Sequence, residues 1–235
     1  SEQWDHFMTG LDAKTGKQLK RYKLTERYTI NSSGFSNFAM DVNGFAYETD
    51  DRGNMIKLNT KTGDIKEYKF PAKIKGTYDN TITPDGRFWV GGGGDLLGLW
   101  DIPHETYNEY QARTPFISYS RGGFDKNGHA WITGRGSGLL VKLEPLTHQL
   151  YEYNPPIPYP TTYEALPDKN GDIWVAVIQS GIFYRFTPKT EKWVGYRLPE
   201  PYSHNRRAWI DNSTTPVSVW YVDHNGYMVR VQPLD

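Results

Sequence analysis

The amino-acid sequence predicts an all-β fold made of a repeated antiparallel unit, and three observations support that prediction. The first is a seven-residue phrase, Asp168–Trp174 (DKNGDIW), which recurs in related forms at four other places. The second is its spacing, because the turn glycines of the phrase lie 42, 42 and 43 residues apart. The third is a composition rich in strand and turn formers, with 15% aromatic residues, 23 Gly and 15 Pro. Such a period in short strands is typical of the blade of a β-propeller.

The related phrases begin with a polar residue and end with an aromatic one. They are DVNGFAY (Asp41–Tyr47), TPDGRFW (Thr83–Trp89), DKNGHAW (Asp125–Trp131) and the looser DNSTTPVSVW (Asp211–Trp220). We expect a turn between a first and a second strand at each of the glycines Gly44, Gly86, Gly128 and Gly171. We expect a core between blades to contain the terminal aromatic residues Tyr47, Trp89, Trp131, Trp174 and Trp220.

Two further strands complete each predicted unit of four antiparallel strands. The third strands are short and apolar, and they span residues 54–59, 96–101, 139–144, 182–187 and 227–232. The fourth strands alternate polar and apolar residues, as outer strands with one solvated face do. They span residues 64–70, 106–112, 148–154 and 191–198.

The two ends of the chain do not contain whole repeats. Residues 6–24 match only a third and a fourth strand, and residues 201–235 supply three strands without a fourth. The two ends could complete one composite blade, although each would then bring a third strand. We favour the other interpretation, in which residues 1–235 form one propeller domain, the C-terminal part of a longer polypeptide. Another protein segment would then supply the missing strands of a ring of about six to eight blades.

Charge and composition exclude several classes of partner. Lys plus Arg and Asp plus Glu number 27 each, so no broad attraction to nucleic acid is indicated. No apolar run is long enough for membrane insertion. The chain has no cysteine, which excludes disulfides and thiolate chemistry and fits either the cytoplasm or the periplasm. We therefore expect a local site for a small-molecule ligand.

The repeat resembles that of the streptogramin B lyase (virginiamycin B lyase) family of seven-bladed propellers. The likeness lies in the PDGRFW and DKNGDIW turns, the glycine-rich sequence after them, and an apolar strand that ends near T-P. This resemblance implies a lyase-like propeller, a C–O lyase acting on a polar or ester-bearing small molecule. A weaker similarity links residues 131–145 and 174–188 to sensor ectodomains and implies a non-catalytic ligand-sensing or protein-docking module. Both imply a periplasmic or secreted bacterial protein.

The lyase resemblance also implies Mg²⁺ or another divalent cation. In that family a carboxylate three residues after the blade aromatic residue takes part in the metal site, with histidines nearby. At the equivalent positions this chain keeps a carboxylate only at Asp50 and Asp223. The resemblance therefore assigns the metal to these two residues. His224 follows Asp223 directly, whereas the family pattern has a gap of one residue.

Register within the repeat places one polar or charged residue per blade at the same level of the central channel. Counting four residues back from the start of each turn phrase gives Asn37, Asp79, Arg121, Glu164 and Arg207. The residues one position earlier include Tyr78, Tyr163 and Arg206. In one interpretation these charges pair with one another and tie the blades together. In the other they form a ligand site, with arginines for a carboxylate or phosphate and tyrosines as stacking walls.

Two histidines, His204 and His224, map to the same face of the last repeat. Because histidine titrates near neutral pH, either could act as the general base of an elimination, or both could be solvated loop residues. The glycine runs at residues 91–95 and 134–138 lack the G-K-S/T of a phosphate-binding loop. We expect them to be tight turns that allow close approach of a ligand.

Overall fold

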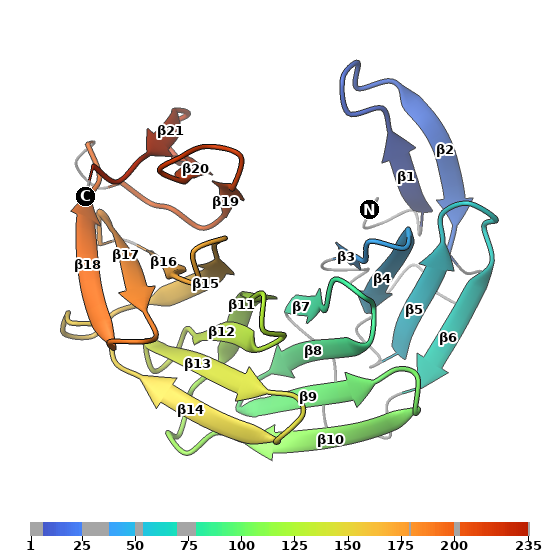
Figure 1. Cartoon of the computed structure of the whole chain (residues 1–235), viewed down its shortest axis with the longest axis horizontal. Helices are drawn as coiled ribbons and strands as arrows, with labels where there is room; N and C mark the ends of the chain where they lie inside the picture. The colour runs from blue at the N-terminus through green and yellow to red at the C-terminus, as the bar shows by residue number, and fades with distance from the viewer. Residues whose placement is uncertain are drawn as a thin grey trace. The chain divides into compact units, whose positions relative to one another are not determined.

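The computed structural model describes residues 7–24, 38–49, 54–69, 79–178, 180–199 and 203–234. Its regular structure is β-strand throughout (Figure 1). In these ranges there is no helix long and apolar enough to cross a membrane. The chain divides into two compact units, with residues 1–93 and 97–110 in unit 1 and residues 94–96 and 111–235 in unit 2.

Unit 1 holds a two-stranded sheet and nearly all of two four-stranded antiparallel sheets. The two-stranded sheet pairs β1 (Phe7–Leu11) with β2 (Gln18–Lys23). The first four-stranded sheet consists of β3 (Phe38–Met40), β4 (Phe45–Thr49), β5 (Asn54–Asn59) and β6 (Ile65–Lys69). The second consists of β7 (Asp79–Ile82), β8 (Phe88–Gly93), β9 (Leu96–Asp101) and β10 (Thr106–Gln111).

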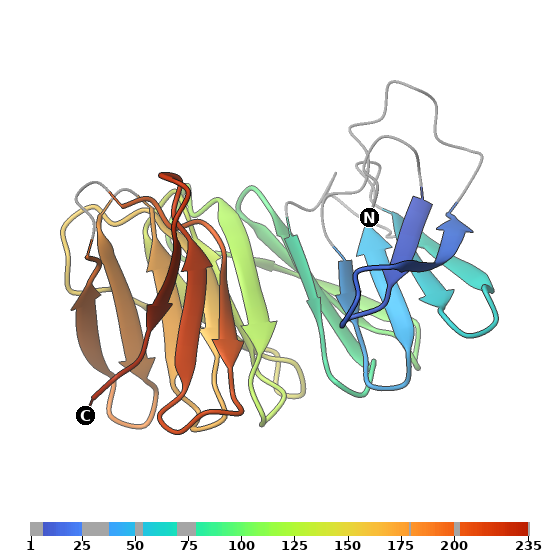
Figure 2. The same cartoon turned by 90° about the horizontal axis from the view of Figure 1, so that it is seen from above.

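Unit 2 holds two further four-stranded blades and a three-stranded sheet, whose strands are coloured from yellow-green to red in Figure 2. The first blade consists of β11 (Tyr119–Phe124), β12 (Ala130–Gly134), β13 (Leu139–Glu144) and β14 (Gln149–Tyr153). The second consists of β15 (Thr162–Pro167), β16 (Ile173–Val177), β17 (Ile182–Thr187) and β18 (Lys192–Arg197). The last sheet consists of β19 (Ala208–Asp211), β20 (Ser218–Val222) and β21 (Met228–Val231). One parallel residue pair between β11 and β15 joins the two blades into an eight-stranded sheet.

In every blade the order of the strands in the sheet follows their order in the chain. This confirms the predicted antiparallel blade of four strands, and the four complete third strands have the predicted bounds. The two incomplete ends are also confirmed, because residues 7–23 give two strands and residues 208–231 give three. The number of blades in a whole ring and the single-domain assignment stay predictions.

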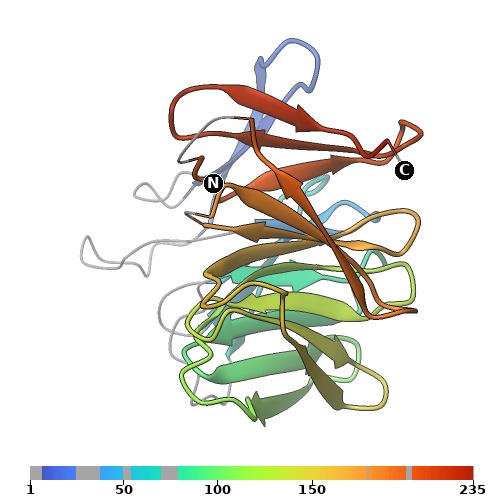
Figure 3. The same ribbon diagram turned by 90° about the vertical axis from the view of Figure 1, so that its left-hand side faces the viewer.

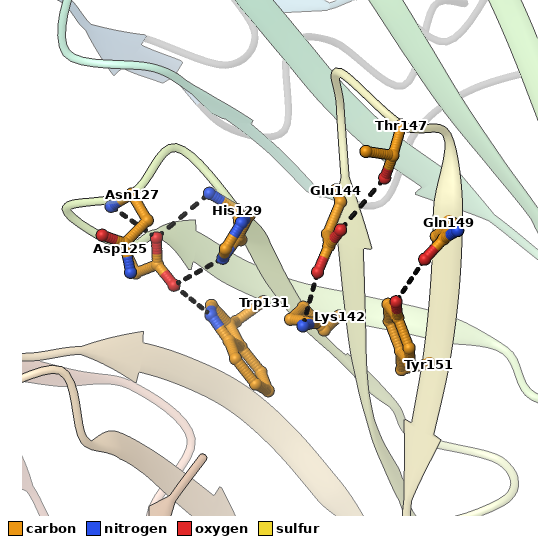
Figure 4. Close-up of polar contacts among 9 residues, drawn as sticks. All are labelled: Asp125, Asn127, His129, Trp131, Lys142, Glu144, Thr147, Gln149 and Tyr151. Atoms are coloured by element: carbon orange, nitrogen blue, oxygen red, sulfur yellow. Dashed lines mark hydrogen bonds and ion pairs between the residues drawn. The ribbon is translucent and has the colours of Figure 1, made fainter. Parts of the chain in front are cut away.

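The repeated phrase folds as a turn that its first carboxylate holds closed (Figure 4). Asp125 Oδ1 accepts the backbone N–H groups of Asn127 at 2.8 Å and His129 at 3.1 Å. Its other oxygen, Oδ2, accepts the indole N–H of Trp131 at 2.8 Å. Gly128 takes the positive φ of 79° that this turn requires. One acid thus fixes both the turn and the orientation of the core aromatic residue.

The same arrangement recurs along the chain. Asp168 Oδ2 accepts the indole N–H of Trp174 at 3.0 Å, and Asp41 Oδ2 accepts the hydroxyl of Tyr47 at 3.0 Å. Where the phrase begins with Thr83, its Oγ1 accepts the N–H of Phe88 at 2.9 Å instead. The predicted turns between first and second strands are therefore confirmed. Their glycines all have positive φ, at 87°, 76°, 79° and 93° for Gly44, Gly86, Gly128 and Gly171.

Four of the five blade aromatic residues form the predicted core, with at most 1% of their surface exposed. They are Tyr47, Trp89, Trp131 and Trp174. The expectation was wrong for Trp220, which is only partly buried. The physical reason is that the described part of the chain gives its sheet three strands, so no outer strand covers the indole.

Candidate functional site

The candidate site lies at one end of the sheets of unit 2, where the inner strands β11, β15 and β19 begin and the second strands β12, β16 and β20 end. The antiparallel registers set this geometry by pairing Tyr119 with Gly134, Thr162 with Val177 and Ala208 with Tyr221. We call this end the entry face, made of residues 119–121, 162–164, 203–208 and 223–227. Polar residues that are far apart in the sequence meet there.

Glu164 is the centre of the predicted ring of charges. Only 4% of its surface is exposed. Its Oε2 accepts the backbone N–H of Ala208 at 2.7 Å, and its Oε1 lies 3.5 Å from Nε of Arg207. Arg121 is the residue paired with Glu164 across the parallel β11–β15 contact. The structure therefore brings Arg121, Glu164 and Arg207 together, as register predicted.

Burial raises the pKa of Glu164 above its ordinary value. The charges of Arg207 and Arg121 and the N–H of Ala208 act in the opposite direction, and they do not fully offset the loss of solvation. The two arginines and the N–H of Ala208 thus stabilise the ionised form of Glu164 less than burial destabilises it. An anion bound on this face would interact with the same arginines and so change the pKa of Glu164.

Arg121 and Tyr163 point to protein rather than to an open site. Arg121 is 9% exposed and Tyr163 is 5% exposed. The guanidinium carbon of Arg121 lies 5.7 Å from the centroid of the Tyr163 ring, within the range of a cation–π contact. The contact joins β11 to β15, so burial of both side chains supports the interpretation in which these residues tie blades together.

The segment before β19 alternates buried and accessible side chains. Ser203 and Asn205 are fully buried, whereas His204 is half-buried and Arg206 and Arg207 are exposed. This alternation is expected for an extended chain that lies on the protein surface. The side chains of His204 and Arg206 therefore reach the surface, while the polar side chains of Ser203 and Asn205 are buried beneath it. The sequence analysis did not predict this alternation.

Asp223 is a turn-capping acid of the same kind as Asp125. Its Oδ1 accepts the N–H of Asn225 at 2.9 Å, and its Oδ2 accepts the hydroxyl of Ser203. Gly226 has a φ of 90°, as the glycine of a D-x-N-G turn does. Burial opposes ionisation of Asp223, but these hydrogen bonds, the N–H of His204 and the charge of His224 outweigh it. The pKa of Asp223 is therefore below its ordinary value.

The described residues do not fit a divalent cation. Asp223 has no exposed side-chain surface, and both of its oxygens accept hydrogen bonds. No group of three His, Asp or Glu side chains that could hold a metal ion occurs in the described ranges. The other proposed ligand, Asp50, lies outside the described residues. The metal assignment therefore stays a prediction from resemblance.

His204 and His224 lie side by side, with ring centroids 5.5 Å apart. Arg206 Nε donates to Nε2 of His204 at 3.4 Å, and His224 Nδ1 lies 3.5 Å from Asp223 Oδ1. Burial lowers the pKa of His204, and the nearby charges of Arg206 and His224 lower it further. The charge of Asp223 acts in the opposite direction without reversing the shift, so the environment of His204 favours its neutral form. The predicted convergence of the two histidines is found in the structure.

The run at residues 134–138 forms the expected tight turn, and its glycines serve packing. Close approach of a ligand there stays a prediction. A Cβ on Gly134 would lie 2.3 Å from Cγ1 of Ile117, and one on Gly136 would lie 2.2 Å from the carbonyl oxygen of Phe116. A Cβ on Gly138 would lie 2.3 Å from the carbonyl oxygen of Pro160. The loops before β11 and β15 already occupy the space that these glycines leave.

Three predicted site residues, Asn37, Tyr78 and Asp50, lie outside the described residues. Asp79 is buried at the start of β7 in unit 1. Arg121, Glu164 and Arg207 of unit 2 are therefore the members of the predicted ring that the structure brings together.

Comparison with known proteins places the fold. No family model matches the chain, and no curated protein matches it. A streptogramin B lyase structure matches with a TM-score of 0.80 and 17% identity over 100% of this chain and 78% of that chain.

Two structures of virginiamycin B lyase from Staphylococcus aureus match in the same way. The selenomethionine-substituted enzyme gives a TM-score of 0.75 at 14% identity, over 98% of this chain and 78% of that chain. A catalytically inactive His-to-Ala variant with quinupristin gives 0.74 at 14% identity, with the same coverage. This chain therefore has the β-propeller fold of these lyases, as its repeated turns predicted.

Proposed function

We propose that this β-propeller module binds an anionic or ester-bearing small molecule on the entry face of unit 2. The observation that best supports the proposal is a group of nitrogen-bearing side chains that reach the surface above two buried acids. The acids are Glu164 and Asp223. The nitrogen-bearing residues are His204, Arg206, Arg207 and His224.

The two arginines are suited to the anionic part of such a ligand. Half of the Arg207 side chain is exposed while its Nε stays near Glu164. A guanidinium has five N–H donors in a fixed plane, so one edge can hold Glu164 while the other binds a carboxylate. Arg206 is exposed and is steadied by its bond to His204. The ligand would thus meet cations that the fold already orients.

The histidines are suited to an elimination. Nδ1 of His224 faces Asp223, which favours the tautomer with its proton on Nδ1 and leaves Nε2 as proton acceptor. We assign His224 the role of general base, while His204 and Arg206 position the leaving group. His224 would take a proton from carbon, a C=C bond would form, and the C–O bond would break to release a carboxylate. The inactivity of a His-to-Ala variant of virginiamycin B lyase supports a histidine in this role.

The second candidate function is a non-catalytic ligand-sensing or protein-docking module of a periplasmic or secreted protein. The observation that favours it is the burial of Arg121 and Tyr163, which turns part of the predicted ligand ring into interior packing. A module of this kind would bind through Arg206 and Arg207 and release its ligand unchanged.

Incubation with quinupristin separates the two functions. Elimination opens an ester ring without adding water, so the product has the mass of the substrate and a different retention time. We expect product with the unchanged chain and a loss of about 10²- to 10⁴-fold in His224→Ala, the range for a general base. His148→Ala, on the outer strand side of unit 2, is the control and should keep the full rate. Binding of quinupristin without product would support the non-catalytic module.

A further inference from the structure

The last sheet leaves one side of β21 without a partner strand among the described residues. Its order is β19–β20–β21, and β21 lies at its outer end (Figures 1 and 3). In the four complete blades the equivalent third strand has a strand on both sides. An unpaired edge exposes N–H and C=O groups that can add another strand.

In the two complete blades of unit 2 the outer strand covers the core tryptophan with a tyrosine. In one blade Trp131 stacks on Tyr153 of β14, with centroids 5.8 Å apart and planes at 29°. In the next, Trp174 packs on Tyr196 of β18 at 5.2 Å and 33°. The two blades thus use the same contact between second and fourth strands.

The register of this contact is the same in both blades. Trp131 lies opposite Lys142, which lies opposite Tyr151, two residues before the stacking Tyr153. In the other blade the corresponding series is Trp174, Arg185 and Val194, two residues before Tyr196. The position of the covering tyrosine is therefore fixed by the strand pairing.

In both complete blades of unit 2 the third strand also places a cation between two aromatic rings. Lys142 Nζ lies 5.9 Å from the Trp131 ring and 4.2 Å from the Tyr151 ring. The guanidinium carbon of Arg185 lies 5.9 Å from the Trp174 ring and 5.7 Å from the Tyr196 ring. The outer strand supplies the second ring in each case.

The last sheet has the aromatic residue of the second strand and the cation of the third strand, but no described outer strand. Trp220 lies opposite Arg230, whose guanidinium carbon is 5.6 Å from the indole ring. Arg230 Nε donates to Ser218 Oγ at 3.0 Å, which holds the cation in place. Within the described residues no second ring covers the pair, and Trp220 stays partly exposed. At the start of β21, 71% of Met228 is exposed.

We propose that β21 takes up an antiparallel strand from a partner polypeptide segment that carries an aromatic residue. The register requires this residue two positions beyond the one opposite Arg230, where it would stack on Trp220 and cover the guanidinium. A second copy of β21 does not meet this requirement, because the strand MVRV has no aromatic residue. Tyr227, just before it, would reach the position only if Asn225 of the preceding turn lay opposite Arg230. This surface does not use the entry face, so the proposal goes beyond the proposed function.

The proposal is tested with a labelled peptide of the sequence EKWVGYRL, residues 191–198, which includes β18. We expect saturable binding to the full chain by fluorescence anisotropy. A peptide with Tyr196→Ala should bind roughly 2- to 12-fold more weakly, the effect of losing one aromatic pair. A scrambled peptide is the control for composition.

Two protein variants locate the contact. Trp220→Ala should weaken binding of the EKWVGYRL peptide to a similar degree. Tyr159→Ala removes a fully exposed aromatic ring from the loop before β15 and should leave binding unchanged. If Trp220→Ala does not fold, the Tyr196→Ala peptide still tests the aromatic contact on the unchanged chain.

Hydrogen exchange identifies the edge that binds. The peptide should slow exchange of β21 amides and leave the amides of β13 unaltered. Absence of binding, or equal binding of the scrambled peptide, would overturn the proposal. Protection of β21 that rises with protein concentration, without peptide, would also overturn it by showing that a second copy occupies the edge.

Discussion

The indole N–H of Trp174 donates to Oδ2 of Asp168 at 3.0 Å, inside a blade core in which the indole has no exposed surface. The other oxygen of Asp168 accepts the N–H groups of Asn170 at 2.8 Å and Asp172 at 3.1 Å. The turn and the core are therefore coupled through one carboxylate.

Replacement of this carboxylate tests the coupling. Asp168→Ala leaves the indole N–H and the turn N–H groups without their acceptor. Since hydrogen bonds to a charged group contribute about 1.5–3 kcal/mol each, we expect the free energy of unfolding to fall by at least about that amount. Urea denaturation measures the change, and Asp64→Ala, at an exposed position on another blade, is the control. Equal stability of the two variants would show that the turn does not depend on its acid.

The fold could be predicted from the sequence because its determinants are local. Asp125, Gly128 and Trp131 fall within seven residues, and they fix a turn whose chemistry repeats with the period of the blade. Strand bounds followed from the same period. Even the capping role of Asp223 had a visible signal, since DHNG has the letters of a D-x-N-G turn.

The site could be predicted only in part, because its character depends on contacts between distant segments. Register correctly placed Glu164 beside Arg121 and Arg207. Burial of Tyr163 against Arg121 depends on how neighbouring inner strands pack, and no local pattern indicates it. The glycines at 134–138 likewise serve loops that lie elsewhere in the chain.

The hydroxyl of Ser203 is predicted to stabilise the ionised form of Asp223. Ser203→Ala removes this donor from a buried carboxylate, so we expect a loss of about 1.5–3 kcal/mol of unfolding free energy at pH 7. The folded-state pKa of Asp223 lies below its ordinary value of 3.8, so its stabilising contribution is present above that pH. It is lost as pH falls through the folded-state pKa. Denaturation at pH 7 and pH 2 should therefore show a difference between the chains that shrinks in acid, and a constant difference would contradict this account.

The buried carboxyl of Glu164 has the opposite pH dependence. Its folded-state pKa is above the ordinary 4.5, so it is most favourable to folding below pH 4.5 and loses that contribution as pH rises through the folded-state pKa. Glu164→Gln keeps an acceptor for the N–H of Ala208 and cannot ionise. Relative to the unchanged chain, the variant should gain about 1.4 kcal/mol between pH 4 and pH 8 for each unit by which the pKa is raised. The two pH profiles of unfolding free energy measure this, and parallel profiles would mean that Glu164 does not titrate differently in the folded chain.

Arg207 and Arg121 should respond differently to the same substitution, although both lie beside Glu164. Half of the Arg207 side chain is exposed, so Arg207→Ala should weaken binding of a carboxylate-bearing ligand by about 1.5–3 kcal/mol, as loss of a charge-assisted hydrogen bond does. Its effect on the unfolding temperature should be small.

Arg121 is 9% exposed and packs on Tyr163, so Arg121→Ala removes a cation from the interior beside a buried acid. The charge of Arg121 offsets part of the cost of burying the Glu164 carboxylate. Removing a cation that compensates a buried charge costs up to about 3–5 kcal/mol, and we expect a clear fall in the unfolding temperature. Thermal denaturation and ligand titration on both variants separate the two roles. The two variants could instead lose the same stability and keep unaltered ligand binding. That result would mean that both arginines only tie the blades together and that the ligand binds elsewhere.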